Sequence, residues 1–153
     1  MAVPMDTISG PWGNNGGNFW SFRPVNKINQ IVISYGGGGN NPIALTFSST
    51  KADGSKDTIT VGGGGPDSIT GTEMVNIGTD EYLTGISGTF GIYLDNNVLR
   101  SITFTTNLKA HGPYGQKVGT PFSSANVVGN EIVGFLGRSG YYVDAIGTYN
   151  RHK

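Results

Sequence analysis

Short apolar runs alternate with polar positions along most of this chain, and Gly, Pro or Asn interrupts them before three helical turns could form. Ile43, Leu45 and Phe47 fall on one face of such a run, and Ile102 and Phe104 fall on one face of another. A period of two is typical of half-buried strands. The pattern predicts strands at residues 28–35, 43–47, 57–61, 99–105, 127–135 and 141–149.

Segments rich in glycine, proline and asparagine separate these runs. They are predicted to be turns or loops, and they cover residues 36–41, 62–67, 95–97 and 112–115. Many short strands at such spacing predict an all-β sandwich, barrel or prism. A length of 153 residues fits one domain over 1–153.

Three weak internal similarities favour duplicated β units of roughly 45 to 60 residues. They pair Gly10–Gly13 with Gly112–Gly115, Tyr82–Phe90 with Tyr142–Tyr149, and Gln30–Tyr35 with Arg100–Phe104.

The charge balance excludes several classes of partner. Lys and Arg total ten, Asp and Glu total ten, and charged residues make up only 13% of the chain, so neither a nucleic acid nor an acidic membrane surface is expected as a partner. No window approaches 18 apolar residues. Residues 1–6 lack the features of a signal peptide, and we expect a cytoplasmic protein.

The sequence also argues against a metal or cofactor site and against catalysis. There is no Cys and there are only two His, of which His111, beside Gly112-Pro113, is expected to be an exposed turn residue. The glycine clusters at 36–39 and 62–65 are not followed by Lys-Ser/Thr, so they are predicted loops and not phosphate cradles. No paired carboxylates and no Gly-x-Ser-x-Gly elbow are evident, so we expect no enzyme and no cofactor.

Several segments, in their order and spacing, carry a resemblance to one family. They are Gly10–Trp20, Ile102–Asn107, Gly112–Gly115, Thr120–Phe122, Ile132–Gly137 and the Gly-x-x-x-Asp segment Gly140–Asp144. Together they resemble the jacalin-related lectins of plants, of the mannose/glucose-binding type, over about Gly10 to Tyr149. The resemblance implies a β-prism I fold of three four-stranded Greek-key sheets with pseudo-threefold symmetry, and sugar binding without metal.

The resemblance also implies a role for each candidate site residue. Asp144 would accept hydrogen bonds from the O4 and O6 hydroxyls of mannose or glucose, because one carboxylate can accept from two hydroxyls. Tyr141 and Tyr142 would donate backbone N–H groups to O5 and O6, and Gly17 would donate its N–H to O3 or O4. Gly140 would allow a tight turn and a close approach of the backbone to the sugar.

The remaining assignments concern the walls of the site. The Tyr141 ring would offer an apolar wall, and alternation predicts that one of Tyr141 and Tyr142 faces inward. Asp95 and Asn96 would lie on a third, variable wall. Trp12 and Trp20 are expected to pack at the end of the prism; stacking on the sugar is the alternative.

Specificity and valency follow from two comparisons. Galactose-binding relatives are cut just before the position of Gly17, whereas Gly17 here follows 16 residues of continuous chain, which favours mannose/glucose. Aligning Tyr82 with Tyr142 places Thr84 opposite Asp144, which predicts one sugar site per chain.

Mannose- or glucose-containing glycans and glycoproteins are the expected partners. Cross-linking them requires at least two sites, so a homodimer is predicted, with a tetramer as the alternative. The competing interpretation of the chain is a storage or structural β-protein with a vestigial sugar site.

Overall fold

The computed structural model describes residues 6–124 and 130–153, and over these ranges it consists of β-strands without a helix. The strands are β1 (Thr7–Gly13), β2 (Asn18–Phe22), β3 (Ile28–Gly36), β4 (Asn41–Thr50), β5 (Lys56–Gly62), β6 (Ile69–Asn76), β7 (Leu83–Tyr93), β8 (Asn96–Thr106), β9 (Ala110–Gly115), β10 (Thr120–Ser123), β11 (Asn130–Ser139) and β12 (Val143–His152).

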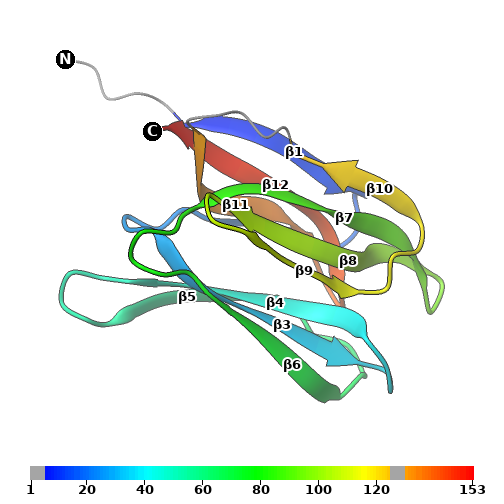
Figure 1. The fold of residues 1–153 in the computed structure, drawn as a ribbon. Helices are drawn as coiled ribbons and strands as arrows, with labels where there is room; N and C mark the ends of the chain where they lie inside the picture. The colour runs from blue at the N-terminus through cyan, green and yellow to red at the C-terminus, as the bar shows by residue number, and fades with distance from the viewer. Residues whose placement is uncertain (1–5, 125–129) are drawn as a thin grey trace.

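The strands form three four-stranded antiparallel sheets, as the resemblance implied. Sheet A has the order β1-β12-β11-β2, sheet B has the order β5-β4-β3-β6, and sheet C has the order β10-β7-β8-β9. Strands β11, β12, β1 and β2 of sheet A correspond in that order to β3–β6 of sheet B and to β7–β10 of sheet C. In each sheet the first two strands form a central hairpin, the third strand pairs with the second, and the fourth pairs with the first, which is a Greek-key order. Figure 1 shows sheet B facing the other two sheets.

This common order decides which internal similarities are structural. β1 and β9 occupy the same place in sheets A and C, so the similarity of Gly10–Gly13 to Gly112–Gly115 is structural. The other two pairings are wrong. Tyr82 precedes β7, the first strand of its unit, whereas Tyr142 precedes β12, the second strand. Gln30 likewise lies in β3, a first strand, and Arg100 lies in β8, a second strand.

Several predicted boundaries also change. Residues 112–115 are part of strand β9, not a turn, and a register irregularity in the β8–β9 pairing accommodates the Gly112-Pro113 pair, whose peptide bond is cis, as is that of Gly10-Pro11. The strand predicted at 141–149 begins at Val143. Of the strand predicted at 127–135, residues 127–129 lie outside the described residues, and the observed strand extends to Ser139.

One phenylalanine from each sheet meets at the centre of the core. Phe47 of sheet B stacks on Phe135 of sheet A with centroids 4.4 Å apart, and Phe104 of sheet C meets both rings edge-on. All three rings are fully buried, and burial of one such side chain stabilises the fold by about 1.5–3 kcal/mol. Trp20 stacks on Phe47 and Trp12 stacks on Phe122, so both tryptophans pack against aromatic rings of the core.

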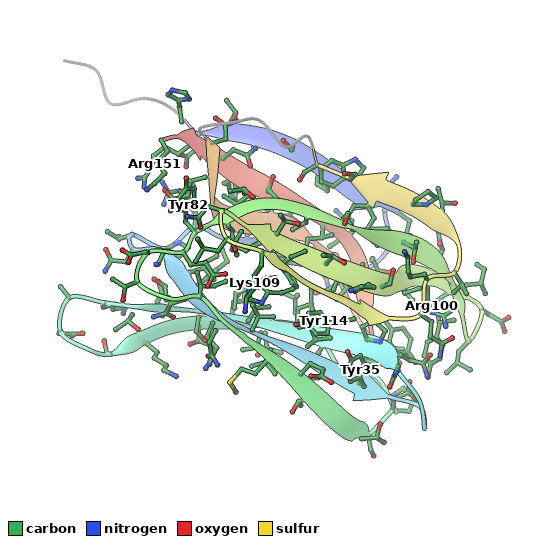
Figure 2. The ribbon with its side chains drawn as sticks, viewed as in Figure 1. Tyr35, Tyr82, Arg100, Lys109, Tyr114 and Arg151 are labelled. Carbon is green, nitrogen blue, oxygen red and sulfur yellow. The ribbon has the colours of Figure 1, made fainter. Side chains whose placement is uncertain are left out.

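The prism has two ends with different connections. The site end carries the turns that join β1 to β2, β3 to β4, β5 to β6, β7 to β8, β9 to β10 and β11 to β12. The distal end carries the turns that join β2 to β3, β4 to β5, β6 to β7 and β8 to β9. Figure 2 shows Arg100 toward the site end and Tyr82 and Arg151 at the distal end.

The distal end contains a partly buried polar cluster, and this corrects the expectation for His111. Its side chain is only 12% exposed, and Nε2 lies 2.8 Å from Glu81 Oε2. Thr106 Oγ1 donates to the same oxygen at 2.7 Å, and Lys27 Nζ donates to the Glu81 carbonyl at 2.7 Å. His111 lies in a strand instead of a turn, and the strand directs its ring toward Glu81.

Candidate carbohydrate-binding site

Two segments of sheet A bring Gly17, Gly140 and Asp144 together at the site end. The first is the 14–17 connection between β1 and β2, and the second is the 140–142 turn between β11 and β12. A Cβ added at Gly16 would lie 3.0 Å from Asp144 Oδ1, and one added at Gly17 would lie 2.6 Å from Asp144 Oδ2. The carboxylate therefore lies directly against the first connection.

Gly17 has both a conformational and a steric reason to be glycine. Its φ is +67°, in the left-handed region that residues with a side chain rarely adopt. A Cβ there would also overlap the Ser139 carbonyl, which is backbone and has little freedom to move. A side chain at this position would thus separate the two segments that form the site.

Gly140 is glycine for a reason other than the expected tight turn. Its φ lies outside the left-handed region, and its N–H donates to the Tyr142 carbonyl at 3.0 Å. A Cβ on Gly140 would meet Gly17 Cα at 3.7 Å and Asp144 Oδ2 at 3.9 Å, with nothing nearer. A methyl group at Gly140 would therefore fit without a clash and would lie within van der Waals distance of the carboxylate.

Arg138 links the two segments from the strand that precedes the turn. Its Nε donates to Gly16 O at 3.0 Å and its Nη2 donates to Gly17 O at 2.9 Å. Burial raises the pKa of Asp144, and the positive charge of Arg138 partly offsets that rise. A half-buried carboxylate beside a guanidinium is suited to accept hydrogen bonds from neutral hydroxyl groups.

Asn14 connects the same site to the β7–β8 hairpin. Its backbone N–H donates to Asp144 O at 2.9 Å, and its Oδ1 accepts from Gly16 N at 2.6 Å. Its Nδ2 donates to Asn97 O in β8. One side chain therefore shapes the glycine turn and joins it to the hairpin.

The two adjacent tyrosines face in opposite directions, as the alternation predicted. Tyr142 is 4% exposed and its hydroxyl donates to Asp67 Oδ2, whereas Tyr141 is 60% exposed in the same turn. The exposed ring is available to an apolar face of a ligand.

Asp95 and Asn96 lie on the β7–β8 turn. Leu94 and Asp95 both have positive φ, which is the geometry of a two-residue hairpin turn, and Asn96 Nδ2 donates to Leu94 O at 2.9 Å. Both predicted residues are exposed. The hairpin reaches the site through Asn97 and Tyr93, and the assignment of Asp95 and Asn96 as binding residues stays a prediction.

Sequence reasoning missed Asn14 and Arg138 as functional residues. Asn14 lies inside the glycine-rich segment that carried the resemblance, so its position was visible but its role was not. Arg138 stands two residues before Gly140, and a cation so close to a Gly-x-x-x-Asp segment is the signal that could have identified it.

The described residues contain neither a cluster of metal ligands nor a helix able to span a membrane. Within 6–124 and 130–153, no three His, Asp or Glu side chains gather as metal ligands. The same residues contain no helix long and apolar enough to cross a membrane.

The fold and the site together define a lectin domain. A family model of the jacalin-like lectin domain matches residues 9–149, and the chain belongs to that family.

A crystal structure of Calystegia sepium agglutinin is 99% identical to this chain, covers 99% of it and 100% of the agglutinin chain, and superimposes with a TM-score of 0.97. A structure of the Calsepa lectin in complex with a bisected glycan is also 99% identical, covers 98% of this chain and 100% of that chain, and has a TM-score of 0.94. The β-prism expectation is thereby confirmed.

Among curated proteins, the mannose/glucose-specific lectin of Parkia pendula is 42% identical over 144 residues, which is 92% of this chain. The chain spans only 31% of the length of that lectin. These relatives are lectins, in agreement with the expectation that the chain is not an enzyme.

Proposed function

We propose that this chain binds glycans that contain mannose or glucose, at one site built around Asp144, without catalysis. The observation that carries the proposal is the meeting of Gly17, Gly140 and the Asp144 carboxylate, where a Cβ on Gly140 would have no contact nearer than 3.7 Å. The two carboxylate oxygens accept from two adjacent sugar hydroxyls, and backbone N–H groups of Gly17, Tyr141 and Tyr142 donate to sugar oxygens.

The similarity to a lectin solved with a bisected glycan and to mannose/glucose-specific lectins supports this ligand class. The sugar specificity is supported by the continuous connection through 14–17, whose Gly17 is held by Arg138 and packed against Asp144.

The common strand order supports one site per chain on firmer ground than the alignment of Tyr82 with Tyr142. Asp144 is the second residue of β12, and the second residues of the equivalent strands are Pro42 in β4 and Asn97 in β8. Neither offers a carboxylate, so neither equivalent turn reproduces the proposed acceptor.

Isothermal titration of methyl α-mannoside, with methyl α-galactoside as control, tests the proposal. We expect millimolar mannoside binding at about one site per chain, no comparable galactoside binding, and loss of binding in Asp144→Ala. No binding of either sugar by the folded wild type would refute the proposal and would favour the storage interpretation.

We further propose that the chain forms a homodimer, because one site per chain cross-links glycans only in an oligomer. Exposed apolar side chains on edge strands, such as Ile8 on β1 and Met74 on β6, are available for an interface. Sedimentation equilibrium distinguishes a dimer from a monomer or a tetramer.

A cytoplasmic location is the remaining proposal. The chain has no Cys and therefore forms no disulfide, which is compatible with a reducing compartment. Fractionation of the source tissue, followed by detection with an antibody, tests it.

A further inference from the structure

Asp67 lies in the 63–68 connection of sheet B, outside the proposed sugar site, yet it contacts two segments that border that site. Its Oδ2 accepts a hydrogen bond from Tyr142 Oη at 3.0 Å and another from Tyr93 Oη at 3.1 Å. Tyr142 belongs to the 140–142 turn, and Tyr93 ends β7 at the hairpin. One carboxylate oxygen therefore joins three connections of the site end.

The same connection supports the 140–142 turn through its backbone. Gly63 N–H donates to Tyr141 O at 2.9 Å. A Cβ on Gly65 would lie 2.8 Å from Tyr141 Cβ, so the chain passes directly behind this residue. Residues 63–67 thus form a buttress, by which we mean this segment of sheet B packed against the turn of sheet A.

On its other side, Tyr93 is held by a buried arginine. The Arg100 guanidinium lies 5.4 Å from the Tyr93 ring centroid, and its Nη1 donates to Ile92 O at 2.6 Å. The Tyr93 and Tyr142 rings meet edge-on with centroids 5.3 Å apart. The two tyrosines therefore have little freedom to turn their hydroxyl groups away from Asp67.

We propose that Asp67 is a positioning residue for sugar recognition, which fixes the 140–142 turn and the β7–β8 hairpin relative to each other through Tyr142 and Tyr93. This inference rests on the proposed function. Hydrogen bonds to a carboxylate are about twice as strong as neutral ones, and both donors here are phenol groups.

Both phenols remain protonated donors at neutral pH. Burial, followed by the contact with Asp67, raises the pKa of Tyr142 to about 12, and the same two causes raise the pKa of Tyr93.

The two bonds predict different consequences for recognition. Tyr142 carries one of the N–H groups proposed to bind the primary sugar, so its displacement weakens binding of every ligand. Tyr93 fixes only the hairpin, so its displacement weakens binding of an extended glycan more than binding of a monosaccharide.

Isothermal titration tests the proposal with methyl α-mannoside and a branched mannotriose as ligands. The variants are Asp67→Ala, Tyr142→Phe, Tyr93→Phe, and Asp67→Ala combined with each of the two Tyr→Phe changes. We expect Asp67→Ala and Tyr142→Phe each to weaken mannoside binding by about three- to tenfold. The double variant Asp67→Ala with Tyr142→Phe is expected to bind mannoside no more weakly than Asp67→Ala alone, because both changes remove the same hydrogen bond. Asp67→Asn, which keeps a neutral acceptor, is expected to fall between Asp67→Ala and the wild type.

Asp53→Ala is the matched control, because Asp53 Oδ1 also accepts two hydrogen bonds, from Ser55 N and Ser55 Oγ, but at the distal end. Its mannoside affinity is expected to equal that of the wild type. Wild-type affinity in Asp67→Ala, or independent effects that multiply in the double variant, would overturn the proposal. A purely structural role would reduce the fraction of active protein and not the affinity of the rest.

Amide hydrogen exchange in the sugar-free protein separates this proposal from the proposed function. Asp67→Ala is expected to speed exchange at Gly140, whose N–H donates to Tyr142 O, and to leave Ile77, which donates to Asn29 O at the distal end, unchanged. If the wild type binds neither sugar, the proposed function fails and this exchange decides the role of Asp67: unchanged protection at Gly140 overturns it.

Discussion

The Asp144 carboxylate packs against the backbone of Gly17, at a distance where a Cβ on Gly17 would lie only 2.6 Å from Oδ2. Asp144 belongs to β12 and Gly17 to the connection that leads into β2, so the last and first parts of the chain build one site. Arg138, which donates to the carbonyls of Gly16 and Gly17, maintains this contact.

Gly17→Ala is therefore expected to damage both the fold and the site. The positive φ costs about 1–2 kcal/mol for an alanine, and the overlap with the Ser139 carbonyl adds to that cost. Urea unfolding should show a loss of about 2–4 kcal/mol, and titration should show no mannoside binding. Gly38→Ala is the control, because Gly38 has φ +75° but open space around it; an equal loss of stability in both variants would contradict the steric argument.

Gly140→Ala is expected to abolish sugar binding without destabilising the fold. The φ of Gly140 lies outside the left-handed region, and a Cβ there would lie 3.9 Å from Asp144 Oδ2, beside the carboxylate proposed to bind the sugar. We expect the free energy of unfolding to change by less than about 0.5 kcal/mol while mannoside binding is lost. Gly39→Ala, where a Cβ would also make only ordinary van der Waals contacts but outside the site, should keep both properties. Retained binding in Gly140→Ala would place the sugar elsewhere.

Mannoside affinity should fall in acid as Asp144 is protonated. Because burial raises the pKa of Asp144 above its ordinary value of 3.8, the midpoint of the loss of mannoside affinity should lie above pH 3.8. The sign for stability is opposite: a carboxyl whose pKa is raised on folding favours the folded state at low pH. Titrations between about pH 7 and pH 3.5, with fluorescence to verify folding, should therefore show binding lost from a folded protein. A midpoint below 3.8 would show that burial does not control this group.

The sequence predicted features whose residues lie close together along the chain, and it missed features whose residues are far apart in sequence. Gly140 and Asp144 lie four residues apart in one turn, and an uninterrupted segment is enough to identify them. Asp67 is 75 positions from Tyr142, and only the packing of sheet B against sheet A brings the two together. The alternation of apolar residues identified Phe47 and Phe104 as core positions, because a strand exposes its period directly.

The errors also have physical causes. Every central strand here is rich in β-branched and aromatic residues, so similar composition paired Tyr82 with Tyr142 across strands that are not equivalent. A Gly-Pro pair usually interrupts a strand, but an irregular register in β9 accommodates Gly112-Pro113 and keeps His111 in the sheet. Strand order and strand register both depend on long-range pairing that no local pattern contains.

The distal cluster should make the stability of this protein depend on pH with a sign opposite to that of Asp144. Hydrogen bonds from Thr106 and His111 lower the pKa of Glu81 from 4.5 to about 2. A carboxyl whose pKa is depressed on folding stabilises the fold above its unfolded pKa, and that stabilisation is lost as pH falls from about 4.5 to about 2. Glu81→Gln should therefore lower the free energy of unfolding by about 2–3 kcal/mol at pH 7, and its difference from the wild type should shrink across this range.

Urea unfolding at several pH values measures this difference, with Glu73→Gln, on an exposed face of β6, as a control expected to show no such trend. A difference between Glu81→Gln and the wild type that stayed constant down to about pH 2 would mean that the cluster stabilises the fold through packing and not through the charge of Glu81.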